Sequence, residues 1–247
     1  MNELESVMRY RGPRRSCLVV PGNKPSVLEK ARGLAADEII IDLEDTVPPE
    51  QKDDALRQVV GFLNACDGMQ KRLTVRVNDT STSRCHRDVL TLIEHASAHL
   101  DAIMLPMTET AGQVQFMHWL MHGAEAANGV RRPIGLVLQL ETSAGLLAAP
   151  ELARASPRVD SLTFGPSDYA KSLGTPKLTA AAHQEALTRI VLAARAAGVR
   201  PIDGPYLDAA DVEGFKSRLQ LSRGLGAHGI WCVRPSQIAL ANEAFAA

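Results

Sequence analysis

The sequence lacks several features that would assign it to a broad functional class. Aromatic residues make up only 4% of its 247 residues. No apolar run reaches the roughly 18 residues of a membrane-spanning helix. The net charge is −1 and no basic stretch dominates, which argues against nucleic acid as the main partner. The amino-terminal stretch is charged and has no apolar signal core, so we expect a cytoplasmic protein with no membrane partner.

Motifs for zinc and nucleotides are also missing. The four cysteines show no CxxC spacing, which favours buried or free thiols over disulfides or a zinc site. The pairs His95/His99 and His118/His122 lack the glutamate of a metalloprotease motif, and we interpret them as ordinary residues of outer helices. No GxxxxGK[ST] motif occurs, and the GxGxxG match at 224–229 precedes a strand instead of following one.

A repeated pattern is present instead, in which a short apolar run leads into a helical pattern. Apolar strands without polar alternation are typical of a parallel sheet covered on both faces. Eight such units predict an α/β protein with a closed (β/α)8 TIM barrel, and an open doubly wound sheet is the alternative. The predicted strands are 16–20, 38–42, 73–77, 101–105, 135–140, 161–164, 199–203 and 229–233.

The sequence has no linker rich in proline, glycine or serine. We therefore expect one barrel domain over residues 14–247, preceded by a loosely held lead-in segment over residues 1–13. A helix over 180–198 should end at Gly198 in a left-handed cap. Another should begin near Asp208, with that residue as its N-cap.

Two acids follow neighbouring predicted strands at points where helices begin. Glu141 ends the apolar part of GLVLQLETSAG, and Asp168 follows the strand at 161–164 through a Gly–Pro–Ser turn. The carboxyl ends of parallel strands meet at one end of a barrel, so we expect both carboxylates to share a hard cation, Mg²⁺. The alternative is that each acid only caps the helix that follows it.

Other strand tips should contribute polar groups to the same end, whereas the opposite end should carry ordinary polar residues. Arg76 is unusual because its neighbours in LTVRV are apolar. We expect its planar guanidinium to bind a substrate carboxylate, and a structural ion pair with Glu44 or Asp45 is an alternative compatible with that role. The remaining tip residues that we expect there are Pro21, Asn23, Asp42, Asn78, Asp203 and Arg234.

Motifs along nearly the whole chain carry a family resemblance. They are PGNKP, IIDLEDTVPPEQK, VRVN, IMLPMTET, LQLETSAGL, FGPSDYAKSLG and VRPSQI. Together they resemble the CitE-like branch of the HpcH/HpaI aldolase and citrate lyase beta-subunit family. This resemblance implies a (β/α)8 barrel, Mg²⁺ and a homo-oligomer, either a trimer or a hexamer. It also implies lysis of a 3-hydroxyacyl thioester of the citryl-, malyl- or citramalyl-CoA type into acetyl-CoA and a 2-oxo acid such as oxaloacetate.

Carried over position by position, the resemblance implies roles for particular residues. Glu141 and Asp168 would hold Mg²⁺, and Arg76 would bind the oxo-acid portion of the substrate. Glu44 and Asp45 would orient Arg76 and a metal-bound water.

Further positions would bind the rest of the substrate. Backbone N–H groups near Gly165, Pro166, Ser167 and Asp168 would meet a substrate carboxylate or carbonyl oxygen. Pro21 and Lys24 would lie at the barrel mouth. Three basic residues, Lys24, Arg14 and Arg15, would meet CoA phosphates there, and the alternative is that they are only solvated.

The chain departs from the family pattern at three positions. Met107 and Ile230 stand where lysine is common, and Arg234 stands where histidine is common. Longer relatives continue into a C-terminal lid, and we expect a barrel without one in a sequence that stops at Ala247. Alternatives to the lyase are an aldolase or thioesterase on the same scaffold, or a non-catalytic subunit that binds an oxo acid, a thioester or an acyl carrier.

Overall fold

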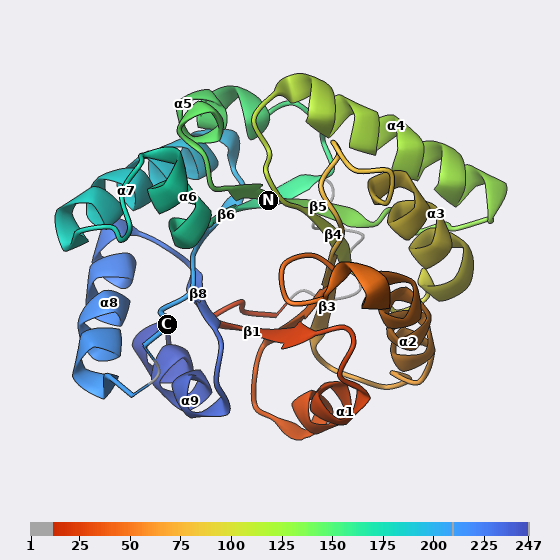
Figure 1. Ribbon diagram of the computed structural model, residues 1–247, viewed down its shortest axis with the longest axis horizontal. Coiled ribbons are helices and arrows are strands. Elements are labelled where there is room, and N and C mark those ends of the chain that lie inside the picture. The colour runs from red at the N-terminus through yellow and green to blue at the C-terminus, as the bar shows by residue number, and fades with distance from the viewer. Residues whose placement is uncertain (1–11, 209, 247) are drawn as a thin grey trace.

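The computed structural model describes residues 12–208 and 210–246, which contain a closed barrel of eight parallel strands. Each strand pairs with the next along the chain, and β8 pairs with β1 to close the ring (Figure 1). The strands are β1 (Ser16–Pro21), β2 (Glu38–Asp42), β3 (Arg72–Arg76), β4 (Ala102–Leu105), β5 (Gly135–Leu140), β6 (Val159–Phe164), β7 (Arg200–Asp203) and β8 (Gly229–Cys232). The predicted (β/α)8 barrel is confirmed, and the β1–β8 pairing excludes an open sheet.

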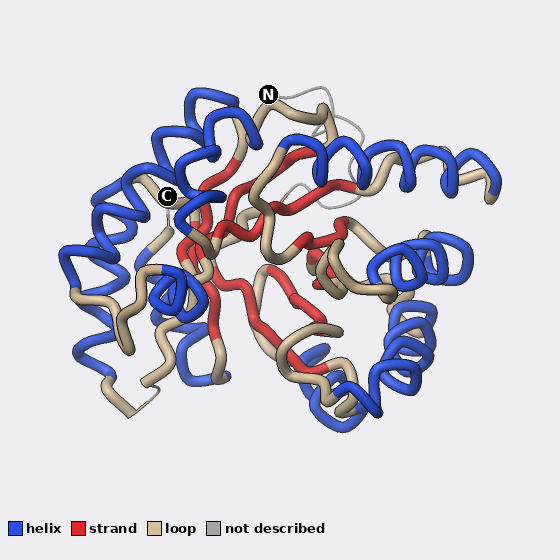
Figure 2. Tube along the Cα trace, turned by 45° about the horizontal axis from the view of Figure 1, so that its top comes forward, coloured by secondary structure: helices blue, strands red, loops and turns tan. Residues whose placement is uncertain are grey.

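Helices form a layer around the outside of the barrel (Figure 2). They are α1 (Pro25–Gly33), η2 (Pro49–Gln51), α2 (Lys52–Asn64), α3 (Cys85–Ala96), α4 (Ala111–Ala127), α5 (Ser143–Leu152), α6 (Pro166–Ser172), α7 (Ala180–Ala197), α8 (Val212–Leu225) and α9 (Pro235–Ala244). Within the described ranges, none of them is long and apolar enough to cross a membrane. Most of the predicted lead-in segment, residues 1–11, lies outside the described residues.

Two helix ends test the predicted caps. Gly198 ends α7 in the left-handed conformation, with φ at 72°, which confirms that prediction. The prediction of Asp208 as the N-cap of α8 is wrong, because Asp211 accepts the capping hydrogen bond from the Gly214 N–H at 2.8 Å. Asp208 instead accepts a hydrogen bond from the Ala210 N–H in the preceding turn.

Side chains alternate along each strand between the barrel interior and the surrounding helices. Outward residues such as Ile39 and Leu138 join the large core between barrel and helices, so both faces of the sheet are covered. All four cysteines are buried and free, as their spacing predicted. The inward residues form a smaller apolar cluster of Cys17, Ile40, Ala102, Met104, Val137, Ile202 and Trp231.

The amino-terminal end of the barrel contains a buried ionic cluster of Arg14, Glu38, Arg72 and Asp160. Glu38 lies 2.8 Å from Arg14 Nε and 3.3 Å from Arg72 Nε, and Asp160 pairs with both arginines. Our expectation of ordinary polar residues at this end is therefore wrong. The expectation that Arg14 and Arg15 meet CoA phosphates at the barrel mouth is also wrong, because both precede β1 at the opposite end and pair with acids there. Inward positions of β2, β3 and β6 meet here inside the barrel, where charges must be paired.

Candidate functional site

Two acids that follow β5 and β6 line the same cavity. Glu141 directly follows β5, points inward and is 2% exposed. Asp168 lies in the first turn of α6, which begins just after β6. Both line a cavity of about 180 Å³ at the carboxyl end of the barrel, together with Gly165, Pro166 and Ser167. The structure therefore brings these five predicted residues together.

Neither acid is the N-cap of the helix that follows it. Thr142 caps α5 by accepting a hydrogen bond from the Gly145 N–H, and Gly165 precedes α6 without a side-chain cap. A Cβ atom at Gly165 would lie 2.4 Å from both Cβ and Oε2 of Glu141. Glycine at this position thus leaves the space that the Glu141 carboxylate occupies.

The Glu141 carboxylate is held in place and surrounded by other charges. Its Oε1 accepts a hydrogen bond from the backbone N–H of Met107 at 2.7 Å. Met107 has φ at 48°, a backbone conformation that few non-glycine residues adopt. Burial raises the pKa of Glu141 to about 8, and Asp168 and Glu44 contribute to the rise while the Met107 N–H and Arg76 oppose it.

The donor set at this point fits Mg²⁺. This ion prefers oxygen ligands and is commonly held by one or two carboxylates, with water or substrate oxygens completing its shell. Over residues 12–208 and 210–246, no group of three or more histidine, cysteine, aspartate or glutamate side chains is placed to hold a metal. Two carboxylates alone, Glu141 and Asp168, would leave open positions for substrate. A cation between them would also offset their mutual repulsion.

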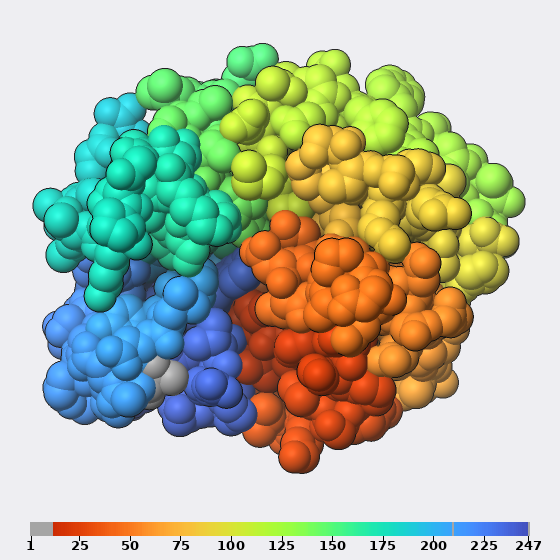
Figure 3. Space-filling model, viewed as in Figure 1, coloured from red at the N-terminus to blue at the C-terminus, as the bar shows by residue number. Residues whose placement is uncertain are grey.

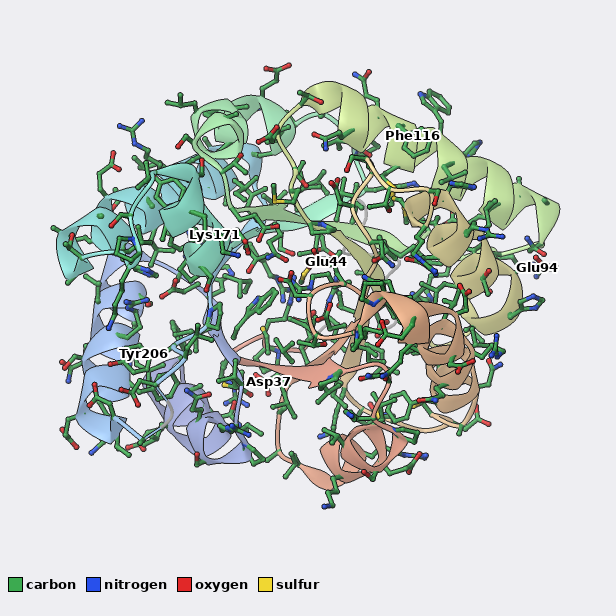
Figure 4. The ribbon with its side chains drawn as sticks, in the orientation of Figure 1. Asp37, Glu44, Glu94, Phe116, Lys171 and Tyr206 are labelled. Carbon is green, nitrogen blue, oxygen red and sulfur yellow. The ribbon has the colours of Figure 1, made fainter. Side chains whose placement is uncertain are left out.

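Asp168 pairs with a lysine one turn further along α6. Lys171 Nζ lies 2.7 Å from Asp168 Oδ1, and the lysine side chain is 77% exposed. Figure 4 shows Lys171 beside α6 at the edge of the barrel opening, and Glu44 near the centre of that opening. Exposed ion pairs of this kind contribute little free energy, so the Asp168 carboxylate remains available to a stronger cation.

Acids surround the guanidinium of Arg76, the last residue of β3. Its Nε and Nη2 lie 2.7 and 2.8 Å from the two carboxylate oxygens of Asp42, and its Nη1 lies 3.1 Å from Glu44 and 3.3 Å from Asp45. Burial opposes the charge, but these acids raise the pKa of Arg76. The expected pairs with Glu44 and Asp45 are present. We missed the main partner, Asp42, although the β2–β3 register places it beside Arg76.

Glu44 lies in the segment that follows β2, beside two other acids. Burial raises the pKa of Glu44 to about 7, with Asp45 and Asp42 contributing to the rise and Arg76 opposing it. Asp45 lines the 180 Å³ cavity, whereas Glu44 is not among the described lining residues. Figure 3 shows the segment after β2 meeting the segments after β6 and β7 over the centre of the barrel.

Three other predicted rim residues lie outside the described lining of this cavity. Pro21 ends β1 and Lys24 directly precedes α1, so both stand at the carboxyl end of the barrel near β1. Arg234 precedes α9, and the adjacent Val233 lines the cavity in its place.

Our expectation that Asp203 joins the acids of the barrel mouth is wrong. The side chain is fully buried against the helices, where it bonds His183 Nε2 at 2.9 Å and Ser222 Oγ at 2.6 Å. Because Ile202 points into the barrel, the next residue along β7 must point outward.

Two inward residues escaped our sequence interpretation. Gln139 of β5 donates from its side-chain amide to Glu141 and accepts from Arg76 Nη1 at 3.4 Å, so it links the two. Trp231 of β8 lines the cavity, and its ring centroid lies 5.6 Å from the Arg76 guanidinium carbon. Counting alternate positions back from Glu141 and along β8 would have found both.

A second cavity of about 620 Å³ adjoins the first. The two share Pro166, Ser167, Pro205 and Leu207 as lining residues. The second cavity lies beside α6 and the segment between β7 and α8, and its cationic lining residues are Lys171, Lys177 and Arg218.

A parallel barrel with carboxylates and an arginine gathered at the carboxyl ends of its strands defines a (β/α)8 protein with an enzyme-like site. The model of the HpcH/HpaI aldolase/citrate lyase family matches residues 15–235, and the chain belongs to that family. This finding confirms the resemblance that the sequence motifs indicated.

Curated relatives and solved structures agree with this assignment. The L-malyl-CoA/beta-methylmalyl-CoA lyase of Cereibacter sphaeroides (strain ATCC 17025 / ATH 2.4.3) is 36% identical, with 94% of this chain and 79% of that one covered. A (3S)-malyl-CoA thioesterase of the same species (strain KD131 / KCTC 12085) is also 36% identical, with 94% and 77% covered. The citrate lyase beta subunit of M. tuberculosis, complexed with oxaloacetate and magnesium, has a TM-score of 0.80 and 28% identity over 100% of both chains.

Proposed function

We propose that this protein is a Mg²⁺-dependent carbon–carbon lyase. Its substrate would be a 3-hydroxyacyl thioester of the citryl-, malyl- or citramalyl-CoA type, cleaved into acetyl-CoA and a 2-oxo acid. The observation that carries this proposal is the shared cavity of Glu141, Asp168 and Arg76 at the carboxyl end of the barrel. The 36% identity to a malyl-CoA lyase and the magnesium bound in a related citrate lyase subunit support it.

In this proposal some side chains bind the metal or the substrate, and others hold those side chains in position. Glu141 and Asp168 would hold Mg²⁺, which when bound stabilises negative charge developing on the substrate hydroxyl. Arg76 would bind an oxygen of the oxo-acid portion, and Glu44 and Asp45 would fix the guanidinium in place. Arg76 Nη1 lies within ion-pair distance of both acids, 3.1 Å from Glu44 and 3.3 Å from Asp45.

The first turn of α6 would hold the substrate carboxylate. Backbone N–H groups of Ser167 and Asp168 lie there, beside the cavity wall that Gly165 and Pro166 help to form. Donors fixed in advance cost little reorganisation when charge shifts during bond cleavage.

The carrier of the thioester must extend beyond this site, because 180 Å³ is smaller than the roughly 300 Å³ of an ordinary ligand pocket. We assign Pro21 and Lys24, near the carboxyl end of β1, to the carrier as a further part of the proposal. CoA and an acyl-carrier protein are both compatible with it. The trimer or hexamer expected from the family resemblance stays a prediction.

A thioesterase is the second candidate function, because a (3S)-malyl-CoA thioesterase is as similar in sequence as the lyase. Incubating the protein with Mg²⁺ and citryl-, malyl- or citramalyl-CoA separates the two. A lyase releases acetyl-CoA and a 2-oxo acid, whereas a thioesterase releases free CoA and the intact hydroxy acid. Release of free CoA without acetyl-CoA would overturn the lyase proposal. No turnover of any of the three thioesters would favour a binding subunit.

Removing the Lys171 side chain should tighten Mg²⁺ binding by about two- to fivefold, because the lysine competes for Asp168 and repels a cation there. Calorimetric titration of Lys171→Ala with MgCl₂ alone measures this. Lys216→Ala is the matched control, since Lys216 pairs with Glu213 at the same i, i+3 spacing and 2.8 Å on α8. Unchanged or weaker Mg²⁺ binding in Lys171→Ala would show that the lysine does not oppose the ion.

A further inference from the structure

The indole N–H of Trp231 is a buried donor without an acceptor. Trp231 is 4% exposed, and among the described residues its Nε1 has no hydrogen-bond partner. An unsatisfied buried donor costs free energy, and native proteins contain few of them. Each such group therefore calls for an explanation, such as an ordered water or a bound molecule.

The position of this donor points to a bound molecule. Trp231 lines the 180 Å³ cavity with Glu141, Asp168 and Arg76, so the indole belongs to the wall of the proposed reaction site. Thr163, on an inward position of β6 beside Gln139, likewise has a buried Oγ1 without a partner in the described part of the chain. Trp231 Nε1 and Thr163 Oγ1 are thus two buried polar atoms without a described partner near the carboxyl end of the barrel. A cavity with such atoms in or near its wall is more consistent with a polar ligand than with an empty apolar space.

The guanidinium of Arg76, the charged donor of this wall that we assign to the substrate, is largely committed. All three guanidinium nitrogens of Arg76 already contact acids, namely Asp42, Glu44 and Asp45. A substrate oxygen must therefore share the guanidinium with these acids. The Trp231 N–H has no such competitor. An indole N–H can only donate, so its partner must be an acceptor, such as an oxygen of a carboxylate.

We propose that Trp231 Nε1–H donates a hydrogen bond to an oxygen of the small 2-oxo or 2-hydroxy carboxylate bound in this cavity. The inference rests on the proposed function, because it places the substrate acid there. It makes Trp231 a substrate-binding residue, with its ring held against Arg76 at 5.6 Å and its N–H reserved for the ligand.

The variant Trp231→Phe keeps an aromatic ring and removes the N–H. Because Phe is smaller than the buried Trp, the midpoint of urea unfolding should fall through lost packing, so binding is compared without denaturant. Titration with MgCl₂ alone should match the wild type and shows that the site is intact. In the presence of Mg²⁺, the dissociation constants of glyoxylate and oxaloacetate should rise about tenfold, the loss of one hydrogen bond to a charged group.

The second tryptophan provides a control and a direct probe. Trp119 on α4 is 66% exposed, so Trp119→Phe should bind both acids like the wild type. It also leaves Trp231 as the single tryptophan of a chain that has two. Its one remaining indole N–H resonance should move downfield when glyoxylate is added with Mg²⁺.

The outcomes distinguish a failure of the Trp231 proposal from a failure of the proposed lyase function. If the wild type binds neither acid with Mg²⁺, the proposed function fails and the inference fails with it. If the wild type binds and Trp231→Phe binds equally well, the lyase site stands and the role of the indole is overturned.

Discussion

Glu141→Gln should remove Mg²⁺-dependent binding of oxo acids and abolish thioester cleavage. The substitution keeps the volume of the side chain but removes the charge of one of the two carboxylates, Glu141 and Asp168, that we propose hold Mg²⁺ in the cavity beside Arg76. Loss of a group that merely supports a ligand typically weakens metal binding 10- to 100-fold. Loss of a ligand itself should therefore weaken Mg²⁺ binding by at least about 100-fold.

Calorimetric titration with MgCl₂, followed by glyoxylate or oxaloacetate, measures this effect without relying on turnover. Glu151→Gln is the control, because Glu151 is an exposed acid on α5 that is not among the described residues lining the cavity. A Glu141→Gln protein that binds the oxo acid as tightly as the wild type would mean that the acids after β5 and β6 do not hold the metal. The lyase proposal would then lose its main support.

Strand order and closure could be predicted because they follow from local pattern. Each apolar run is short and is followed by a helix, and right-handed crossovers between parallel strands then leave few arrangements. The residues at the strand ends, such as Glu141, follow from the same rule, since parallel strands present their carboxyl ends together. No long-range information is needed for either step.

The direction in which each tip residue points was harder to predict. Asp203 looks like the other tip acids in the sequence, yet it faces the helices because Ile202 faces the interior. Asp42 was not recognised as the partner of Arg76, because that pairing depends on the β2–β3 register. A shift of one residue along a strand decides whether a side chain points into the barrel or toward the surrounding helices. Apolar strands without alternation do not reveal which residues face which side.

The charged end of the barrel escaped prediction for a related reason. Arg14, Glu38, Arg72 and Asp160 come from separate segments, and each looks like an ordinary polar residue at the start of a strand. Only closure of the barrel brings them together, and only then does pairing become necessary. The apolar cluster inside the barrel is small, and the four charged side chains occupy the barrel interior at its amino-terminal end, where apolar side chains would otherwise be needed.

Glu38→Gln should lower the free energy of unfolding by about 3–5 kcal/mol, because it leaves buried arginines without their main counter-charge. The Glu38 carboxylate bonds Arg14 Nε at 2.8 Å and accepts from Thr74 Oγ1 at 2.6 Å, and it also pairs with Arg72. In the variant, Asp160 still pairs with both arginines, but the charge of Glu38 is lost. Equilibrium urea unfolding at pH 7 measures the difference.

The pH dependence of that difference distinguishes lost charge pairing from altered packing. Burial alone would raise the pKa of Glu38, but Arg14 and Arg72 outweigh it and lower the pKa to about 2, from an ordinary value of 4.5. A lowered pKa means that the stabilisation is complete above pH 4.5 and is lost as the pH falls toward 2. The gap between wild type and Glu38→Gln should therefore narrow over this range. Glu29→Gln, which breaks an exposed pair with Arg32, should cost less than about 1 kcal/mol at any pH, and a gap for Glu38→Gln that is equally small or independent of pH would contradict the ionic origin of the effect.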